Sequence, residues 1–594
     1  MSPPDAAVDT AQAQAPAEAR SADRALVAAA RHSGGRTAAV LGCAVAAAAA
    51  ALAEPAILGH TLDLLLRRAP SGPAWTLLCA AVIAAEVTLD AAAARLTGEV
   101  DGRSTARLRR LGLTRLLRTA PHHAARYAPG ETAARLTAHA TEAGKVPAAA
   151  AHAVAALVAP LGAVAALFLI DLWTALAFLL GVPLLVLLLR AFARDTLTSV
   201  ARYQQVQLAT AGRLVEALAG ARTIAAAGTA ERERTRILAQ LPELGAEGRR
   251  MWQVYGGTTA RSAALMPMLL YVVLAVGGIR LSAGAIGVGE LLAASRYAAL
   301  AAGIGAVTGG LAAVVRGRAA ARRTAALLAL PELGHGRAEL PQDGPGTLEL
   351  RDVRVVRGGS TVLHDISLVI PGGTTVAVVG RSGAGKTLFA AVAGRLTDPD
   401  TGQVLLDGVP LREVSAEALR REVGYAFDRP VLLGDTVGDA IGFGAGPDPG
   451  PEAVRAAARA ACADPFVRHL PHGYDTRLAD APLSGGEVQR LGLARSFCHA
   501  GRLLVLDDAT SSLDTVTARE VERALAHAIR PGTRIVVAHR LSSAVRADLV
   551  VWLEDGRLRA TGAHDALWRC EPAYREVFAA AAETGAQADR EVAR

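Results

Sequence analysis

The sequence TVAVVGRSGAGKTLFA occupies Thr375–Ala390 and predicts the fold of the second half of the chain. Its first part, Thr375–Val379, is β-branched and apolar, as in a buried strand. Gly380–Thr387 then matches the pattern G-x-x-x-x-G-K-[ST] at every fixed position, and Leu388–Leu396 is mostly helix-forming. A strand, a glycine-rich loop and a helix in this order form the context that a phosphate-binding loop requires.

The chemistry of this loop follows from its residue types. Glycines let backbone N–H groups turn inward around phosphate oxygens, and the N-terminus of the following helix adds positive potential. Lys386 would neutralise the β- and γ-phosphates of a nucleotide, and the Thr387 hydroxyl would bind Mg²⁺. A chance match is disfavoured because the chain contains only two lysines, Lys145 and Lys386. The expected nucleotide contacts here are Gly380, Arg381, Ser382, Gly383, Ala384, Gly385, Lys386, Thr387 and Leu388.

Further motifs follow downstream in a fixed order. LSGGEVQR occupies Leu483–Arg490, and the apolar run LLVLDD at Leu503–Asp508 ends in two carboxylates. SSLD follows at Ser511–Asp514, and AHR comes after another predicted strand at Ala538–Arg540. Together with the phosphate loop, this set resembles the ATP-binding cassette (ABC) family, from Leu348 to about Phe578. Several motifs in the family's order are far more specific than one motif alone.

Composition indicates more than one domain and a membrane component. A chain of 594 residues is too long for one compact core, and a hydrophobic content of 52% exceeds that of ordinary soluble domains. The net charge of +8 does not indicate nucleic acid binding, because arginines are expected in cytoplasmic loops and near anionic lipids. The five cysteines include no C-x-x-C pair, which predicts neither a metal site nor a disulfide framework. We expect no cleavable signal peptide.

The first half of the chain contains six apolar segments near the length of about 20 residues that a membrane span requires. Their approximate bounds are 37–66, 75–94, 146–170, 172–189, 262–279 and 291–315. The connections Arg95–Lys145 and Arg190–Arg261 are long and rich in arginine, whereas the others are short. The positive-inside tendency places both long connections, and both termini, in the cytoplasm. A buried helical domain is the alternative, because several segments are alanine-rich.

This layout resembles the six-span domain of ABC exporters, whose span helices continue into the cytoplasm. Leu214–Ile224 and Arg126–Leu136 resemble two stretches of that domain. The expected fold class is an α-helical six-span membrane domain followed by an α/β P-loop NTPase (ATP-binding cassette) domain. The expected divisions are a disordered tail at 1–20, the transmembrane domain at 21–330, a linker at 331–347, the cassette at 348–580 and a C-terminal tail at 581–594.

Two carboxylates interrupt the second apolar segment. Glu86 and Asp90 are four residues apart and therefore lie on one helix face. One interpretation is a polar patch in a substrate cavity. The other, which we favour from the sequence, is that the span ends earlier and that both groups lie in water or among headgroups.

The ABC resemblance implies roles for residues outside the phosphate loop. Asp507 would complete the Mg²⁺ shell, and His539 would contact the γ-phosphate. Ser484, Gly485, Gly486 and Glu487 belong to the signature motif, which in this family closes over the nucleotide of a second cassette. Its position at a helix N-terminus would point amides and the helix dipole at that γ-phosphate.

Three positions depart from the family pattern. Asp508 replaces the glutamate that positions the attacking water, and one methylene fewer withdraws the carboxylate by about 1–1.5 Å, enough to cost around a hundredfold in rate. Asp428 replaces the glutamine of the Q-loop, where it can still bind Mg²⁺ or water. Arg357 replaces the aromatic residue that stacks on adenine, and a guanidinium plane can stack as well.

The departures surround this chain's own phosphate loop, whereas its signature is nearly intact. This pattern predicts an exporter half-transporter that uses ATP and Mg²⁺ and pairs with a second half-transporter. In that heterodimer, this chain contributes a degenerate site and completes the partner's competent one. A homodimer with an active Asp508 is the alternative, as is a mainly regulatory ATP-binding subunit or a siderophore importer with an exporter-like fold. We expect a plasma-membrane protein with a cytoplasmic ATPase domain, and a small-molecule or peptide substrate.

Overall fold

The computed structural model describes residues 34–444, 449–499, 501–527, 532–538 and 540–578. The predicted tails at 1–20 and 581–594, and His539, lie outside these residues. The chain divides into two compact units. The first comprises the described residues up to Leu117 together with Tyr127–Leu330. The second comprises Arg118–Arg126 and the described residues from Pro331 onward.

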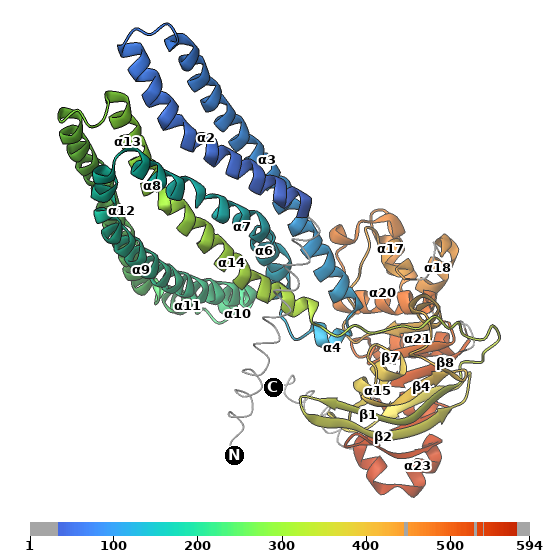
Figure 1. Cartoon of the computed structure of the whole chain (residues 1–594). Helices are drawn as coiled ribbons and strands as arrows, with labels where there is room; N and C mark the ends of the chain where they lie inside the picture. Colours follow the sequence, from blue (N-terminus) through green and yellow to red (C-terminus); the bar gives the residue numbers. More distant parts are fainter. Residues whose placement is uncertain (1–33, 445–448, 500, 528–531, 539, 579–594) are drawn as a thin grey trace. The chain divides into compact units, whose positions relative to one another are not determined.

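The first unit is helical throughout its described elements (Figure 1). Its helices are α2 (Gly34–Leu66), α3 (Gly72–Arg118), α5 (Pro129–Ala134), the π-helical η1 (Arg135–His139), α6 (Ala140–Gly144), α7 (Val146–Ala155), α8 (Val158–Ile170), α9 (Leu172–Ala219), α10 (Ala221–Ala226), α11 (Ala230–Leu238), α12 (Leu241–Ser282), α13 (Val288–Ala301), the 3₁₀ turn η2 (Ala302–Ile304) and α14 (Gly305–Leu328). Each of the six predicted apolar segments lies within these helices.

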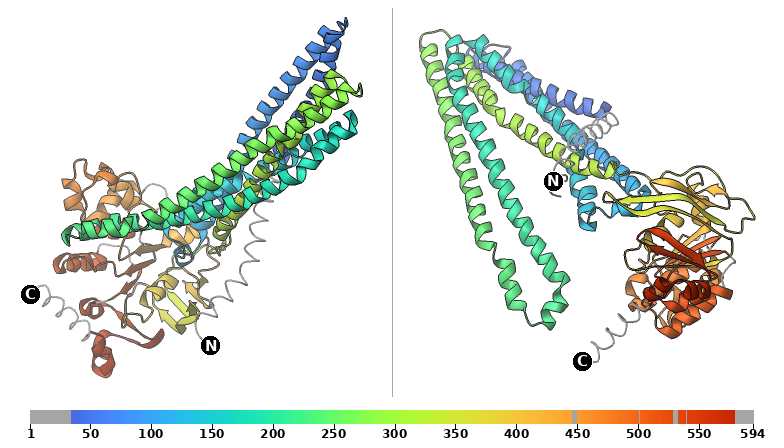
Figure 2. Two further views of the ribbon diagram at one scale, coloured as in Figure 1. Left: turned by 90° about the vertical axis from the view of Figure 1, so that its left-hand side faces the viewer. Right: turned by 90° about the horizontal axis from the view of Figure 1, so that it is seen from below.

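Three stretches of described residues are long and apolar enough to cross a membrane: Gly34–Leu66, Gly72–Arg118 and Pro129–Ile170. Two shorter apolar stretches, Leu172–Gly181 and Pro267–Ser282, lie within α9 and α12. These two helices pack along each other, and both views in Figure 2 show them as a long pair. At 1.5 Å per residue, the 48 residues of α9 extend about 72 Å, far beyond a hydrocarbon core of about 30 Å. The predicted continuation of span helices beyond the membrane is therefore present.

Close helix packing in this unit depends on small residues. A Cβ atom added to Gly59 of α2 would lie 2.4 Å from the carbonyl oxygen of Gly289 in α13, so only glycine fits there. The Asp63 carboxylate accepts a hydrogen bond of 2.8 Å from the Gly289 N–H. The Tyr297 hydroxyl donates to the Leu52 carbonyl at 2.9 Å. Small residues at helix contacts are the usual solution in membranes, where apolar burial gives little driving force.

Glu86 and Asp90 both line a cavity of about 520 Å³ within this unit. Residues of α2, α7, α8, α13 and α14 form the rest of its wall, and His152 of α7 also contributes. Both carboxylates thus line one cavity, as the first of the two interpretations requires. The sequence could not distinguish them, because α3 continues as one helix well past both carboxylates.

The second unit is built on two sheets. The six-stranded sheet has the order β10-β9-β3-β8-β7-β6, and the four-stranded sheet has the order β2-β1-β4-β5. The strands are β1 (Leu348–Arg357), β2 (Ser360–Ile370), β3 (Thr375–Val379), β4 (Thr401–Leu406), β5 (Val409–Pro410), β6 (Val423–Ala426), β7 (Leu503–Asp507), β8 (Thr533–Val537), β9 (Leu549–Glu554) and β10 (Arg557–Gly562).

The helices of the second unit connect and cover these strands (Figure 1). They are α4 (Pro121–Ala124), α15 (Lys386–Ala393), α16 (Ala416–Glu422), α17 (Val437–Gly442), α18 (Gly450–Ala460), α19 (Asp464–His469), α20 (Gly485–Cys498), α21 (Thr515–His527), α22 (Leu541–Arg546) and α23 (His564–Cys570). Short 3₁₀ turns lie at Gly473–Asp475 and Leu478–Asp480. The predicted strand Thr375–Val379 coincides with β3, every residue of which after Thr375 is buried.

Asp171 stabilises the start of α9 within the helical unit. Its carboxylate accepts a hydrogen bond of 3.0 Å from the Thr174 N–H and lies 2.9 Å from a guanidinium nitrogen of Arg280. We predict that Asp171→Ala destabilises the protein by about 2–3 kcal/mol, because it removes both the helix cap and the ion pair. Asp171→Asn keeps the cap and should cost less. Thermal unfolding midpoints in lipid nanodiscs would check this, and equal midpoints for the two variants would contradict it.

Candidate nucleotide-binding site

The site lies at one edge of the six-stranded sheet. Strands β3, β8, β7 and β6 run parallel, so their carboxyl ends meet at the same edge. The phosphate loop follows β3, Asp507 is the last residue of β7, and Phe427 follows β6. Sites in open parallel sheets form at this edge because the connecting loops converge there.

Glycines at three positions shape the phosphate loop. Gly380, Gly383 and Gly385 have φ values of 155°, 85° and 90°, which L-residues with side chains rarely adopt. A Cβ atom on Gly380 would also lie 2.3 Å from the Leu553 carbonyl oxygen of β9. Helix α15 begins directly after the loop, at Lys386, so its first N–H groups face the enclosed space.

The Lys386 side chain folds back over this loop. Its Nζ donates hydrogen bonds to the carbonyl oxygens of Gly380 at 2.9 Å and Arg381 at 3.1 Å. Burial lowers the pKa of Lys386, and the negative charges of Asp508 and Asp507 offset part of that effect. The ammonium group is thus held beside the loop amides, where it adds to their attraction for phosphate oxygens.

Thr387 and Asp507 form the polar pair that a nucleotide-bound magnesium ion would use. The Thr387 hydroxyl donates to the Asp507 carboxylate at 3.1 Å, across 120 residues of sequence. A hydroxyl and a carboxylate are hard oxygen donors, which Mg²⁺ prefers, and protein Mg²⁺ sites commonly take their remaining ligands from substrate phosphates and water. The described residues contain no cluster of three His, Cys, Asp or Glu side chains that could hold a metal by itself. The donor set fits an ion that binds together with the nucleotide.

The structure places the two substituted carboxylates differently. Asp508 directly follows β7 with a φ of 51°, and its charge acts on Lys386. Asp428 instead accepts a hydrogen bond from the Arg429 N–H at 2.8 Å, and its side chain is largely exposed. In the described part of the chain, the Asp428 carboxylate contacts Arg429 and not the Thr387–Asp507 pair. The metal contact of Asp428 stays a prediction, and it would require this side chain to turn away from Arg429.

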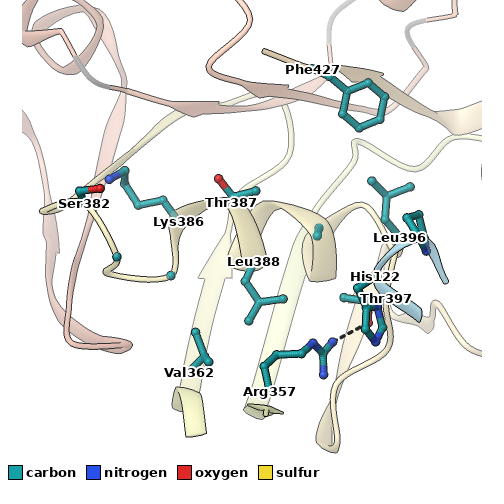
Figure 3. A pocket seen from close by; sticks show the side chains of 14 residues that line it. His122, Arg357, Val362, Ser382, Lys386, Thr387, Leu388, Leu396, Thr397 and Phe427 are labelled. Carbon is teal, nitrogen blue, oxygen red and sulfur yellow. Dashed lines mark hydrogen bonds between the residues drawn. The ribbon is translucent and has the colours of Figure 1, made fainter. Parts of the chain in front are cut away.

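A cavity of about 690 Å³ opens from the phosphate loop (Figure 3). Of the ten expected contacts with this chain's own nucleotide, seven line it: Arg357, Ser382, Gly383, Gly385, Lys386, Thr387 and Leu388. Several other residues that line the cavity were not predicted from the sequence. These are Pro121, His122, Val362, Ala391, Leu396, Thr397 and Phe427. Val362 lies next to the buried Leu363 in β2, a strand that the sequence predicts. Nothing in the sequence connects His122 to a loop more than 250 residues away.

Arg357 occupies the far part of the cavity with its guanidinium group engaged. Nη1 donates to the Val356 carbonyl at 2.8 Å, and Nη2 donates to the Thr397 hydroxyl at 2.8 Å. The Asp400 carboxylate lies 3.6 Å from Nη1. The group is consequently fixed in place by three neighbours.

The signature motif forms the start of α20. Ser484 is the N-cap, and its hydroxyl and N–H both donate to the Glu487 carboxylate, at 2.8 and 2.7 Å. The Glu487 N–H in turn faces the Ser484 hydroxyl at 3.4 Å, which completes a capping box. These bonds hold the pKa of Glu487 below its usual range. Glu487, expected to contact nucleotide, thus caps its own helix.

Beside the capped motif, Gly485 has open space where a side chain would point. Gln489, one turn further along α20 and 2% exposed, was missed by the sequence analysis. Its side-chain oxygen accepts a hydrogen bond of 3.0 Å from the Ser512 N–H, so it ties the signature helix to the Ser511–Asp514 stretch. In the phosphate loop, Ala384 is buried, whereas Arg381 is exposed. The Arg381 guanidinium nitrogen Nη2 lies 3.5 Å from the Glu576 carboxylate.

The fold and this site define a P-loop ATPase that is fused to a helical membrane domain. The family model of the ABC transporter ATPase matches residues 363–511, and that of the ABC transporter transmembrane region matches residues 37–303. The chain belongs to the ABC transporter family, whose members are ATP-hydrolysing transporters.

Similar proteins extend this result. The chain is 57% identical over 541 residues to the ABC transporter ATP-binding protein RamA of Streptomyces coelicolor, and these residues make up 91% of this chain and 85% of RamA. It is 36% identical over 260 residues to an ATP-dependent lipid A-core flippase of Methylococcus capsulatus, or 43% of each chain. A solved bacterial Atm1-family ABC exporter with ATP bound has a TM-score of 0.75 at 23% identity, over 92% of this chain and 98% of that one. The fold is therefore that of an exporter-type half-transporter.

The Thr387 hydroxyl gives a direct test of the site. We predict that Thr387→Val weakens Mg²⁺-dependent ATP binding by about tenfold or more, because a hydrogen-bonding ligand to a charged centre is lost. Thr387→Ser keeps the hydroxyl and should bind ATP nearly as well as the unmodified protein. Equilibrium binding with a fluorescent ATP analogue, with and without Mg²⁺, would measure both. Unchanged binding by Thr387→Val would show that this hydroxyl is not part of the site.

Proposed function

We propose that this chain is one half of a heterodimeric exporter, in which its own phosphate loop forms a degenerate ATP site. Its signature motif completes the competent site on the partner half-transporter. The observation that carries this proposal is an asymmetry within one domain. The substitutions at Asp508, Asp428 and Arg357 all concern the chain's own nucleotide, whereas the capped signature at Ser484–Glu487 would serve the partner's.

The chain's own site retains what is needed for binding. The loop glycines, Lys386 and the Thr387–Asp507 pair support nucleotide and Mg²⁺ binding. Hydrolysis is an in-line attack of water on the γ-phosphate, and it requires a carboxylate at the correct distance to position that water. Asp508 is one methylene shorter than the family's glutamate, and a misplacement of about 1 Å can cost a hundredfold in rate. Binding without efficient turnover follows.

The signature motif, unlike the chain's own nucleotide site, is nearly intact. The Ser484–Glu487 capping box fixes the first turn of α20, and the space beside Gly485 lets a phosphate approach the backbone closely. A capped helix N-terminus with glycine at its first position suits binding of a γ-phosphate carried by another chain. This supports the assignment of the intact half-site to the partner's nucleotide.

The transport cycle follows from two cassettes that share nucleotides. Closure on ATP and reopening after hydrolysis would rock the membrane helices between two states, which are biased by the bound nucleotide. The arginines that α3 carries beyond its apolar part favour cytoplasmic placement of the ATPase domain and both termini. The name of the Methylococcus relative, an ATP-dependent lipid A-core flippase, supports a membrane-associated or amphipathic small molecule or peptide as the substrate.

The test is ATP turnover by this chain purified alone in lipid, with Lys386→Ala as the blank. We predict nucleotide binding with Lys386-dependent turnover far below about 1 s⁻¹, an ordinary enzyme rate. Asp508→Glu restores the carboxylate length and should raise turnover by up to about a hundredfold.

Steady Lys386-dependent turnover at an ordinary rate would instead establish a working homodimer and exclude a degenerate site. Within a purified heterodimer, the same Lys386→Ala change distinguishes a silent site in this chain from one that hydrolyses ATP. Transport should fall only modestly if the site is silent, and it should collapse if the site turns over.

A further inference from the structure

Helix α4 belongs to the same compact unit as the cassette, although its sequence lies between α3 and α5 of the helical unit. Thr119 forms a β-bridge with Glu332, and the Leu333 N–H donates to the Arg118 carbonyl at 2.8 Å. These contacts fix the segment Arg118–Arg126 on the second unit. Two consecutive histidines, His122 and His123, are carried there with their ring centroids 3.8 Å apart.

His122 lines the nucleotide cavity, whereas His123 does not. Figure 3 shows the His122 ring beside Leu396 and Thr397, at the end of the cavity away from Ser382 and Lys386. A triphosphate on the phosphate loop would direct its nucleoside toward this end of the cavity. His122 therefore lies where the base would lie.

The residue at the expected stacking position is poorly suited to that task. Arg357 is half-buried, and its guanidinium is held by Val356, Thr397 and Asp400. Of the described residues that line the cavity, two carry aromatic rings, His122 and Phe427. The Phe427 ring stacks on Tyr425, with centroids 4.7 Å apart and planes 24° apart, so one of its faces is already covered. The His122 and His123 rings are tilted by 42° and are not stacked face to face.

The protonation state of His122 suits contact with a neutral base. Burial and the positive charges of Arg357, His123 and Arg126 lower the pKa of His122 to about 4, and Asp400 offsets part of this effect. The ring is thus uncharged near neutral pH, and a base could cover it without removing an ionised group from water.

We infer that His122 of α4 supplies the aromatic face on which the purine base of ATP stacks, in place of the aromatic residue whose position Arg357 occupies. This inference rests on the proposed nucleotide site of this chain and adds a residue that contacts the base. Stacking on an aromatic face tolerates different bases, and it is lost when the ring is removed. A base contact would then come from a segment encoded between two membrane helices.

The experiment compares ATP with inorganic tripolyphosphate, both with Mg²⁺, as ligands of the full chain in lipid nanodiscs. Tripolyphosphate engages the phosphate loop and has no base. We expect His122→Ala to weaken ATP binding by about tenfold, or about 1.4 kcal/mol, while tripolyphosphate binding stays unchanged. His122→Phe restores an aromatic face and should bind ATP like the unmodified chain. His123→Ala removes the adjacent ring, which lies against His122 but does not line the cavity; it should weaken ATP binding less than His122→Ala does and leave tripolyphosphate binding unchanged.

Several outcomes would overturn the inference. One is unchanged ATP binding by His122→Ala, and another is equal weakening of both ligands, which would indicate damage to the phosphate site. A loss in His122→Phe as large as in His122→Ala would exclude stacking, and that variant also decides the matter if the alanine variant does not fold. Absence of ATP binding by the unmodified chain, or binding that Lys386→Ala leaves intact, would instead refute the nucleotide site itself.

Discussion

The hydrogen bond between the Thr387 hydroxyl and the Asp507 carboxylate joins the two halves of the ATP site, at 3.1 Å and 120 residues apart in sequence. It can form only because β3 and β7 lie in one parallel sheet, separated by β8, with their carboxyl ends at the same edge. The apolar strands keep this pair in place, and the glycines at positive φ shape the loop that precedes Thr387. A change in the strands would move the oxygen atoms that would hold a magnesium ion.

Around that preserved centre, the site has changed in a selective way. The groups that bind phosphate are retained, and the group that positions water is shortened at Asp508. The signature motif also has an acidic residue where the family differs, and there the helix cap is kept. Glu487 closes a capping box with Ser484 and so stabilises the helix end that would face a second nucleotide.

Much of this architecture was predictable from local sequence. The strand Thr375–Val379 appears as expected, and the six apolar segments fall in helices, because periodicity and apolar length depend on neighbouring residues alone. The contributions of His122 and Phe427 to the cavity were not predictable, since they depend on how distant segments meet. The Asp428 contact with Arg429 and the cavity beside Glu86 have the same origin. Side-chain direction at such places is decided by tertiary packing, which one sequence does not encode in its local pattern.

The central claim is that two different half-transporters share their nucleotides. The most direct test is the mass, by native mass spectrometry, of the complex purified from its natural membrane through a tag on this chain. The account predicts one 61.0 kDa copy of this chain together with one different ABC half-transporter. A particle made of two copies of this chain, stable without any other half-transporter, would contradict it.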